Sequence, residues 1–510
     1  MPIAKSNELI SLIKSLTKAE KRNFKLYAGR NQNDADFRFI ELFDILEKMD
    51  QYDEDKILKN FAPLSKAKLA NLKRHLYTQI LSSLRVITVS KRPNIEVREM
   101  IDFAYILYDK SLYIEALKIL KRAKKHADKY HLYNMYLAIL EFEKKIESRH
   151  ITRSGKDKAF ILIDEAEGIR KKVSDSIQLS NLRIRLHATY LENGHSQSEE
   201  ENKVLETLLK KSLEQIDEDA LGLVEKVYLY QSYVWYYHIL LDFESCLHYS
   251  EKWLELLENN PSMIERDVDL YLRAHHYVLS SCFHLRNRDK HNEVLANLEY
   301  YRKSNYKRFS ELSKIISFQY VHTGRLNKII IEGNFDRSHE VISRVLRRIK
   351  KYQDKLDSHK ILVFYFKIAW IHFGNSNYSK AIFYLNRIVN NELPNLRVDL
   401  QIYSRILFLM CHYELGNFDI FQYSITSFRP YINKVKREFP VLKIVQEMFL
   451  KVADIPRTEH KPYFKECLSK LKEISANSVY GVSFTYLDVI SWLESKMSNT
   501  TLAAIIKKKD

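Results

Sequence analysis

Glycine, proline and cysteine are scarce in this chain of 510 residues, which contains 10 Gly, 9 Pro and 4 Cys. So few turn-forming residues leave no room for a low-complexity linker or for the many short strands of an all-β fold. The four cysteines show no paired spacing, which argues against a disulfide framework or a zinc site and favours packing roles. They are Cys246, Cys282, Cys411 and Cys467.

Long apolar runs are also missing. No stretch approaches the roughly 18 apolar residues of a membrane span, and the first residues, MPIAKSNELI, lack the apolar core of a signal peptide. We therefore expect a cytoplasmic protein with no membrane partner.

The sequence motifs of common enzymes are absent as well. There is no P-loop, dinucleotide glycine fingerprint, HExxH, nucleophile elbow or kinase signature. The densest histidine group, His275 and His276 with His284 and His291, has no clustered carboxylates, so packing or surface roles are favoured over a metal site. The sequence predicts a non-enzyme without a cofactor, and no small-molecule substrate is evident.

What the chain has in quantity is apolar and aromatic residues, 45% and 12% of the total, which excludes a disordered protein. The most informative stretch is Ile361–Asn391. Ile361–Phe373 is apolar nearly all round, a turn-forming Gly-Asn-Ser-Asn follows, and Ser379–Val389 alternates as an amphipathic helix. This pattern predicts two helices joined by a tight turn.

These residues resemble the tetratricopeptide repeat (TPR) family. Its motif places an aromatic after the turn, a small residue three positions on, and apolar residues four and seven positions after that; here they are Tyr378, Ala381, Leu385 and Ile388. The small-residue position recurs every 40 to 48 residues. It falls at Ala116, Ala159, Val204, Cys246, Val294, Ser338, Ala381, Phe421 and Cys467.

The predicted fold is therefore all-α: an α-solenoid of antiparallel helix pairs, TPR-like, with about nine units and an N-terminal helical cap. The period exceeds the roughly 34 residues of a TPR and is nearer the roughly 40–47 of other helical-pair repeats. An irregular helical bundle is the alternative. We expect a basic helical domain at 1–95, the repeat array at 96–475, and a C-terminal capping helix and tail at 476–510.

Positive charge exceeds negative charge by 17, with 82 Lys and Arg against 65 Asp and Glu. The excess is concentrated at 1–95 and at 302–351, where the net charges are +7 and +9. Such faces suit phosphate contact, and 1–95 could be a helix-turn-helix-like module. A capping domain and a solvated repeat surface are the alternatives. The candidate polyanion contacts are Lys66, Lys68, Lys73, Arg74, Arg344, Arg347, Arg348 and Lys351.

The TPR resemblance implies that the first helix of each pair lines a concave groove. Carried onto this chain, the family's groove positions form an aromatic set suited to a peptide. They are Tyr228, Trp235, His276, Phe283, Tyr320, Phe366, Trp370, Tyr403, Met410 and Tyr413. Core packing is the alternative role for each. Some TPR proteins bind a C-terminal carboxylate with a clamp of basic residues. That clamp is not evident in this sequence, and Asn327 alone suits it.

Two functions follow as expectations. The first is a scaffold that binds a peptide or protein partner along its groove. The second is a nucleic-acid- or ribosome-associated protein that uses the basic faces. A third option is a regulator that combines a repeat sensor with an N-terminal nucleic-acid module. Such an arrangement resembles the general layout of peptide-sensing bacterial regulators.

Overall fold

The computed structural model describes residues 6–29, 34–60, 65–88, 92–149, 157–196, 198–353, 355–390, 398–434, 440–475 and 487–509. Within these ranges the chain is all α, with 25 α-helices, three short 3-10 helices and no strand. The chain is divided into two compact units, residues 1–169 (unit 1) and residues 170–510 (unit 2). The boundaries expected after residues 95 and 475 stay predictions.

Unit 1 is built from eight helices and the first turns of a ninth, α9, which continues into unit 2. Their bounds are α1 (Ser6–Ser15), α2 (Lys18–Ala28), α3 (Asp34–Lys48), α4 (Glu54–Asn60), α5 (Lys66–Thr88), α6 (Pro93–Asp109), α7 (Tyr113–Lys129), α8 (Tyr133–Arg149) and α9 (Lys158–Asn193). Helices α1 to α5 share an apolar core, in which the Phe24 and Phe43 rings lie 4.8 Å apart. A capping box starts α2: the Thr17 N–H donates to Glu20 at 2.7 Å, and the Glu20 N–H donates to the Thr17 hydroxyl at 3.3 Å.

Unit 2 contains the remaining helices. Their bounds are α10 (Glu199–Leu213), α11 (Leu223–Ile239), α12 (Phe243–Glu258), α13 (Pro261–Arg266), α14 (Val268–His284), α15 (Arg288–Asn305), η3 (Tyr306–Arg308), α16 (Glu311–Glu332), η4 (Phe335–Ser338), α17 (His339–Tyr352), α18 (Ser358–Gly374), α19 (Tyr378–Val389), α20 (Val398–Leu415), α21 (Phe418–Lys434), α22 (Pro440–Ala453), η5 (Arg457–Glu459), α23 (His460–Ser475), α24 (Val489–Ser498) and α25 (Leu502–Lys507). The two helices expected in 361–391 are confirmed as α18 and α19.

Many of the helices pack as consecutive pairs. The pairs α6–α7, α11–α12, α14–α15, α18–α19, α20–α21 and α22–α23 are each in contact. At seven of the nine recurring positions the side chain is buried: Ala116, Cys246, Val294, Ser338, Ala381, Phe421 and Cys467. The expectation is wrong at Ala159 and Val204, which are exposed; Ala159 lies in the first turn of the 36-residue helix α9 and Val204 lies on α10.

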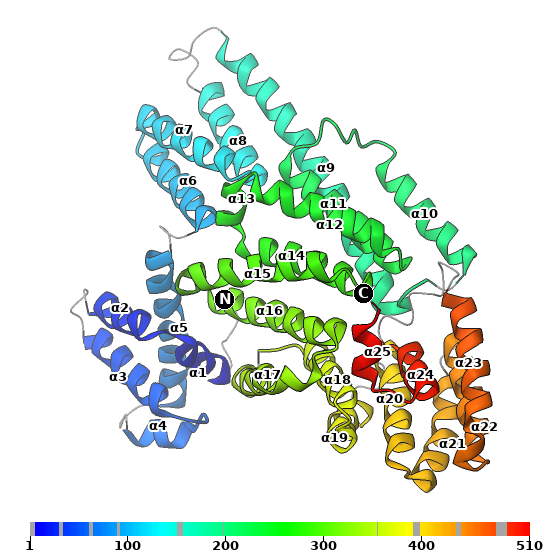
Figure 1. Cartoon of the computed structure of the whole chain (residues 1–510). Coiled ribbons are helices and arrows are strands. Elements are labelled where there is room, and N and C mark those ends of the chain that lie inside the picture. The colour runs from blue at the N-terminus through cyan, green and yellow to red at the C-terminus, as the bar shows by residue number, and fades with distance from the viewer. Residues whose placement is uncertain are drawn as a thin grey trace. The chain divides into compact units, whose positions relative to one another are not determined.

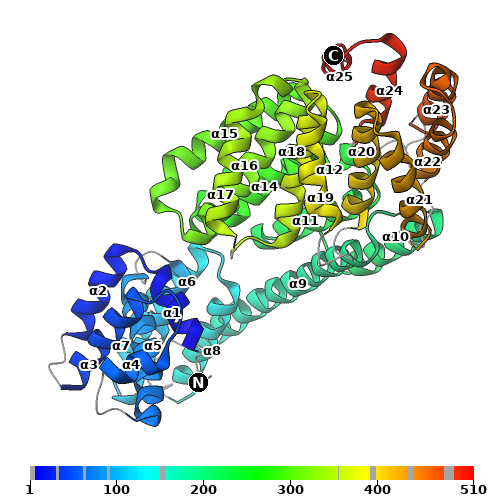
Figure 2. The same cartoon turned by 90° about the horizontal axis from the view of Figure 1, so that it is seen from below.

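The first helices of successive pairs are neighbours in unit 2. Helix α14 contacts α16, α16 contacts α18, and α18 contacts α20. Figures 1 and 2 show the helices from α11 to α19 stacked side by side. One face of each first helix therefore contributes to a common surface.

The C-terminal helices fold back within unit 2 onto elements far away in the sequence. Arg286 forms an ion pair with Asp488, the N-cap residue of α24, and the Arg288 guanidinium donates to the Ile506 carbonyl at 2.8 Å. Trp492 of α24 donates to Glu414 of α20 at 2.7 Å. A helix is thus observed within the expected C-terminal capping region, α24 from Val489 to Ser498, and residues 476–486 of that region lie outside the described residues.

Candidate binding cavity in unit 2

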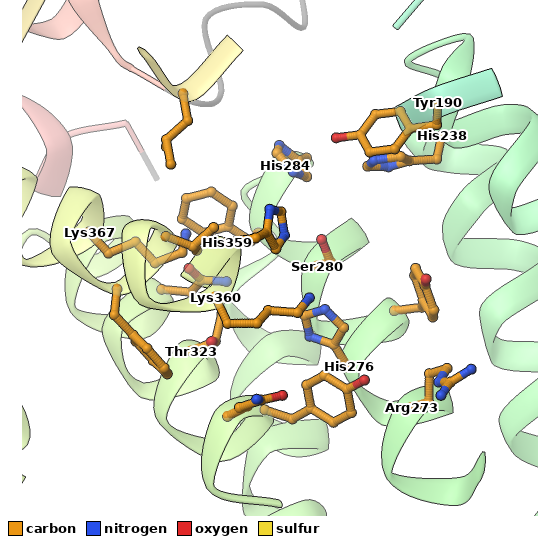
Figure 3. A pocket seen from close by; sticks show the side chains of 18 of the residues that line it. Tyr190, His238, Arg273, His276, Ser280, His284, Thr323, His359, Lys360 and Lys367 are labelled. Carbon is orange, nitrogen blue, oxygen red and sulfur yellow. The ribbon is translucent and has the colours of Figure 1, made fainter. Parts of the chain in front are cut away.

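A cavity of about 420 Å³ opens where the first helices of unit 2 meet α9. Volumes of this order are typical of binding sites for small ligands or for a few side chains of a larger partner. Helices α9, α11, α14, α16 and α18 each contribute two or more lining residues, and Leu400 of α20 completes the wall. Figure 3 shows these side chains converging on one space.

Helical spacing explains why each helix presents several residues to the cavity. On α14 the lining residues Arg273, His276, Ser280 and His284 are three or four positions apart, so they lie on one face. On α18 the same spacing joins Lys360, Val363 and Lys367. On α9 it joins Arg183, His187 and Leu191.

Four permanently charged groups line the cavity, and all are cations: Arg183, Arg273, Lys360 and Lys367. None of the described residues that form its wall is an aspartate or glutamate. Every one of the four is half-buried. The cavity therefore concentrates positive charge where water screens it only partly.

Five histidines share the wall, and burial together with the neighbouring cations lowers the pKa of several of them. Burial, followed by Lys360, Lys367 and Arg273, lowers the pKa of His276 to about 3. Figure 3 shows the Lys360 side chain extending toward His276. Burial, Arg183 and Lys360 likewise lower the pKa of His187, so both rings are uncharged near pH 7.

Aromatic rings form another part of the wall. The His276 ring stacks on Tyr320 with centroids 4.3 Å apart, and the Lys367 ammonium lies 4.5 Å from the centre of the Phe283 ring. The Trp235 ring of α11 lies 5.8 Å from the Tyr277 ring of α14. These rings offer apolar area beside the charges and hold the charged groups in place.

Asn327 of α16 adds an unsatisfied polar group to this wall. Its side chain is 4% exposed, and its Oδ1 atom has no hydrogen-bond partner among the described atoms. A buried polar atom without a partner is uncommon and marks a place where a ligand can supply the missing bond.

The ten predicted groove residues fall into two groups. Half of them line the cavity: Trp235, His276, Phe283, Tyr320 and Phe366. Tyr228 lies next to it, with its ring 5.7 Å from the Arg183 guanidinium. The other four, Trp370, Tyr403, Met410 and Tyr413, are no more than 8% exposed and belong to an apolar core that includes Leu487, Trp492 and Ile506.

The C-terminal helices explain the burial of that second group. The Trp492 ring of α24 lies 5.8 Å from the Tyr413 ring. Trp370 lies in a small enclosed space that Asp488 and Ile506 also line. Where the sequence alone suggests one continuous aromatic row, five of the ten residues line the cavity, and two of these, Phe283 and Phe366, also belong to the same apolar core as the second group.

Three of the eight cations on the predicted basic faces contact carboxylates or Tyr hydroxyls of the same unit. On α5, Lys66, Lys68 and Arg74 are exposed, whereas Lys73 bonds Tyr52 at 2.6 Å and Glu54 at 3.3 Å. On α17, Arg347 and Lys351 are exposed, Arg344 pairs with Glu340, and Arg348 donates to the Tyr352 hydroxyl at 3.2 Å. Their role in polyanion contact stays a prediction.

The described residues offer little for covalent chemistry. All four cysteines are buried, and burial raises the pKa of Cys282 and of Cys467 to about 12 and that of the other two thiols well above its usual range. No group of three or more His, Cys, Asp or Glu in the described ranges is arranged to hold a metal ion. No helix in these ranges combines the length and apolar character needed to cross a membrane.

Sequence reasoning missed the cations of the cavity. Arg183, Arg273, Lys360 and Lys367 are not in the predicted groove set, because the groove positions that the TPR resemblance implies do not fall on them. A signal was present: basic residues and histidines repeat at intervals of three and four on the inner faces of α9, α14 and α18. A comparison with models of known protein families gives no match, and a comparison with curated protein sequences gives none either.

Proposed function

We propose that this chain is a non-enzymatic binding protein in which the helix pairs of unit 2 form a TPR-like solenoid. Its concave side takes up a segment of a partner protein or peptide, and the cavity is where that segment docks. The observation that carries this proposal is the convergence of five helices, each with one face toward the same cavity.

The chemistry of the wall supports binding over catalysis. Aromatic rings with a few placed polar groups are typical of recognition sites. The four thiols are buried, and burial raises their pKa, so they are protonated near pH 7. Stacking and charge, by contrast, are both available to a bound segment.

Nucleic-acid or ribosome binding through the basic faces is the second candidate. The exposed Arg347 and Lys351 on α17 favour it. Several other cations in 302–351 are already matched within the unit: Arg325 pairs with Glu299 at 2.6 Å, and Lys314 pairs with Glu311 at 2.7 Å. We therefore rank it below peptide binding.

Site-specific photo-cross-linking in the native host tests the proposal. A photo-reactive phenylalanine analogue replaces Trp235, which lines the cavity, and in a second protein it replaces Tyr300, which is 75% exposed on α15. We expect a peptide of a defined partner to be joined to position 235 and not to position 300. Equal cross-linking at both positions, or none at 235 in a folded protein, would contradict the proposal.

A further inference from the structure

A cluster of cations and tyrosines lies where the end of α15, the start of α16 and the end of α17 meet. Six residues form this arginine–tyrosine cluster: Arg302, Tyr306, Lys314, Arg348, Lys351 and Tyr352. None of the six is among the residues that line the cavity. The cluster is therefore a separate site from the one proposed for a peptide or protein partner.

Two tyrosine rings hold the cations of the cluster together. The centre of the Tyr306 ring lies 5.3 Å from the Arg302 guanidinium and 5.8 Å from the Lys314 ammonium. The Tyr352 ring lies 5.9 Å from the Arg348 guanidinium, which also donates to the Tyr352 hydroxyl at 3.2 Å. Burial raises the pKa of Tyr352, and so does the neighbouring Tyr306 phenol, which shares a hydrogen bond with it. The two phenols thus bring cations of α15, α16 and α17 to one place.

Positive charge in the cluster exceeds the negative charge that contacts it. Lys351 places an ammonium 5.4 Å from the centre of the Tyr352 ring, and Lys314 pairs with Glu311 at 2.7 Å. Within the described part of the chain, Glu311 is the carboxylate that contacts these cations, and neither arginine has an ion pair with one. Four cations against one carboxylate leave an excess of three positive charges.

Both arginines of the cluster are half-buried, so water screens their charges only partly. Burial lowers the pKa of Arg302, and the charges of Arg325 and Arg348 lower it further, whereas Tyr306 opposes them. The Arg302 Nε atom is buried and has no hydrogen-bond partner among the described atoms. The Tyr306 ring eases the burial of this guanidinium but supplies no acceptor to that N–H group. An anion that accepts from both guanidiniums would stabilise the cluster.

The number of donors indicates a phosphate group rather than a carboxylate. A carboxylate brings one negative charge, whereas a phosphomonoester brings about 1.5 to 2 near pH 7 and three acceptor oxygens. Two guanidinium forks can bond these oxygens at once, since Arg forms paired bonds to phosphate. Single-stranded nucleic acid fits less well because its bases stack on exposed rings, and Tyr352 is 4% exposed while Tyr306 is half-buried between its cations.

We propose that the arginine–tyrosine cluster binds a phosphomonoester group, carried by a small molecule or by a phosphorylated side chain. Arg302 and Arg348 donate to the phosphate oxygens, and the exposed Lys351 adds an ammonium to the same group. Lys314 stays paired with Glu311 and keeps its place beside the Tyr306 ring.

Titration calorimetry on the full chain tests the proposal with matched probes. O-phospho-L-serine is compared with L-glutamate, which has the same amino-acid end but a carboxylate in place of the phosphate. We expect phosphoserine to bind, and glutamate to bind at least about tenfold more weakly. A nine-residue peptide with a central phosphoserine, measured against the same peptide with serine, distinguishes the two sources. Tighter binding of the phosphopeptide than of free phosphoserine indicates a phosphorylated side chain, and equal binding indicates a small molecule.

Two double variants locate the bound phosphate. Arg302→Gln with Arg348→Gln removes both guanidiniums of the cluster, and Arg344→Gln with Arg347→Gln removes two exposed charges from α17. We expect the first to bind phosphoserine at least about tenfold more weakly and the second to bind it like the parent. If the first variant does not fold, Arg302→Lys with Arg348→Lys keeps the charges but loses the planar forks, and it should also bind more weakly.

Four results would overturn the proposal. Glutamate that binds as tightly as phosphoserine shows a carboxylate site, and binding of a single-stranded RNA alone shows a nucleic-acid surface. Phosphoserine that binds neither the parent nor the control, or that the cluster variant retains in full, leaves no phosphate site here. Loss of phosphoserine from an Arg183→Gln, Lys360→Gln variant, with the cluster variant unaffected, places the phosphate in the cavity. The cross-link from position 235 tests the proposed function separately.

Discussion

The replacement of Gly374 by alanine tests how closely successive helix pairs approach. Gly374 is the last residue of α18, and a Cβ atom there would lie 2.5 to 2.6 Å from three atoms of the Phe335 ring. Phe335 is 1% exposed and belongs to the core of unit 2, so its ring has little space to move. Overlap of this size in a packed core costs about 1–3 kcal/mol.

A second glycine in a helix provides the matched control. Gly168 lies inside α9, and a Cβ atom there would meet nothing within 4 Å. Because alanine is favoured over glycine in a helix, Gly168→Ala should stabilise by about 0.5–1 kcal/mol. The same gain offsets part of the overlap in Gly374→Ala, which leaves a net loss of up to about 2.5 kcal/mol.

Hydrogen exchange read separately in α9 and α18 measures both effects, and heat unfolding gives a second readout. We expect Gly168→Ala to raise the free energy of unfolding and Gly374→Ala to lower it. Adding Phe335→Leu, which removes ring atoms, should recover part of the loss in the Gly374→Ala protein, and a double-mutant cycle isolates that coupling. If Gly374→Ala stabilises α18 as much as Gly168→Ala stabilises α9, the close approach of Gly374 to the Phe335 ring is contradicted.

Two further predictions concern the C-terminal contact and the thiols. Burial raises the pKa of Asp488, but Arg286 and the hydrogen bonds from Ser491 are among the causes that lower it by more, so the folded pKa lies below the usual value. Asp488→Asn should therefore lower the free energy of unfolding, measured in urea at pH 7, by about 1–2 kcal/mol. Because the folded pKa is the lower one, this difference should vanish as the pH falls below about 3.9 and through the folded value; a difference that persists there contradicts the ion pair. The buried thiols should react with Ellman's reagent only after guanidinium unfolding, and rapid labelling of the native protein at pH 7 would count against their burial.

Local pattern was enough to predict much of the helical structure. The apolar period and the Gly-Asn turn of 361–391 predicted α18 and α19 to within three residues at each end, because these signals depend only on near neighbours. The buried positions Ala116, Ala381 and Cys467 were predicted in the same way. Helix α9 runs on as one long helix through Gly168, and the expected helix pair is not formed.

Long-range contacts could not be predicted from the sequence. The cavity joins residues from Arg183 to Leu400, and nothing local indicates that their helix faces meet. The burial of Trp370 and Tyr413 depends on helices α24 and α25, which return to residues about 200 positions earlier, as the pair Arg286–Asp488 shows. A periodic pattern predicts which face of a helix is turned away from solvent. It does not predict which of these faces stays accessible to a ligand.

The central claim is that the cavity of unit 2, rather than an exposed basic face, captures the partner. Affinity purification from the native host tests it most directly, with and without nuclease, using the parent chain and the Arg183→Gln, Lys360→Gln variant. The account predicts that the same partner proteins remain after nuclease and are lost from the variant. Partners that vanish with nuclease, or that the variant retains in full, would contradict it.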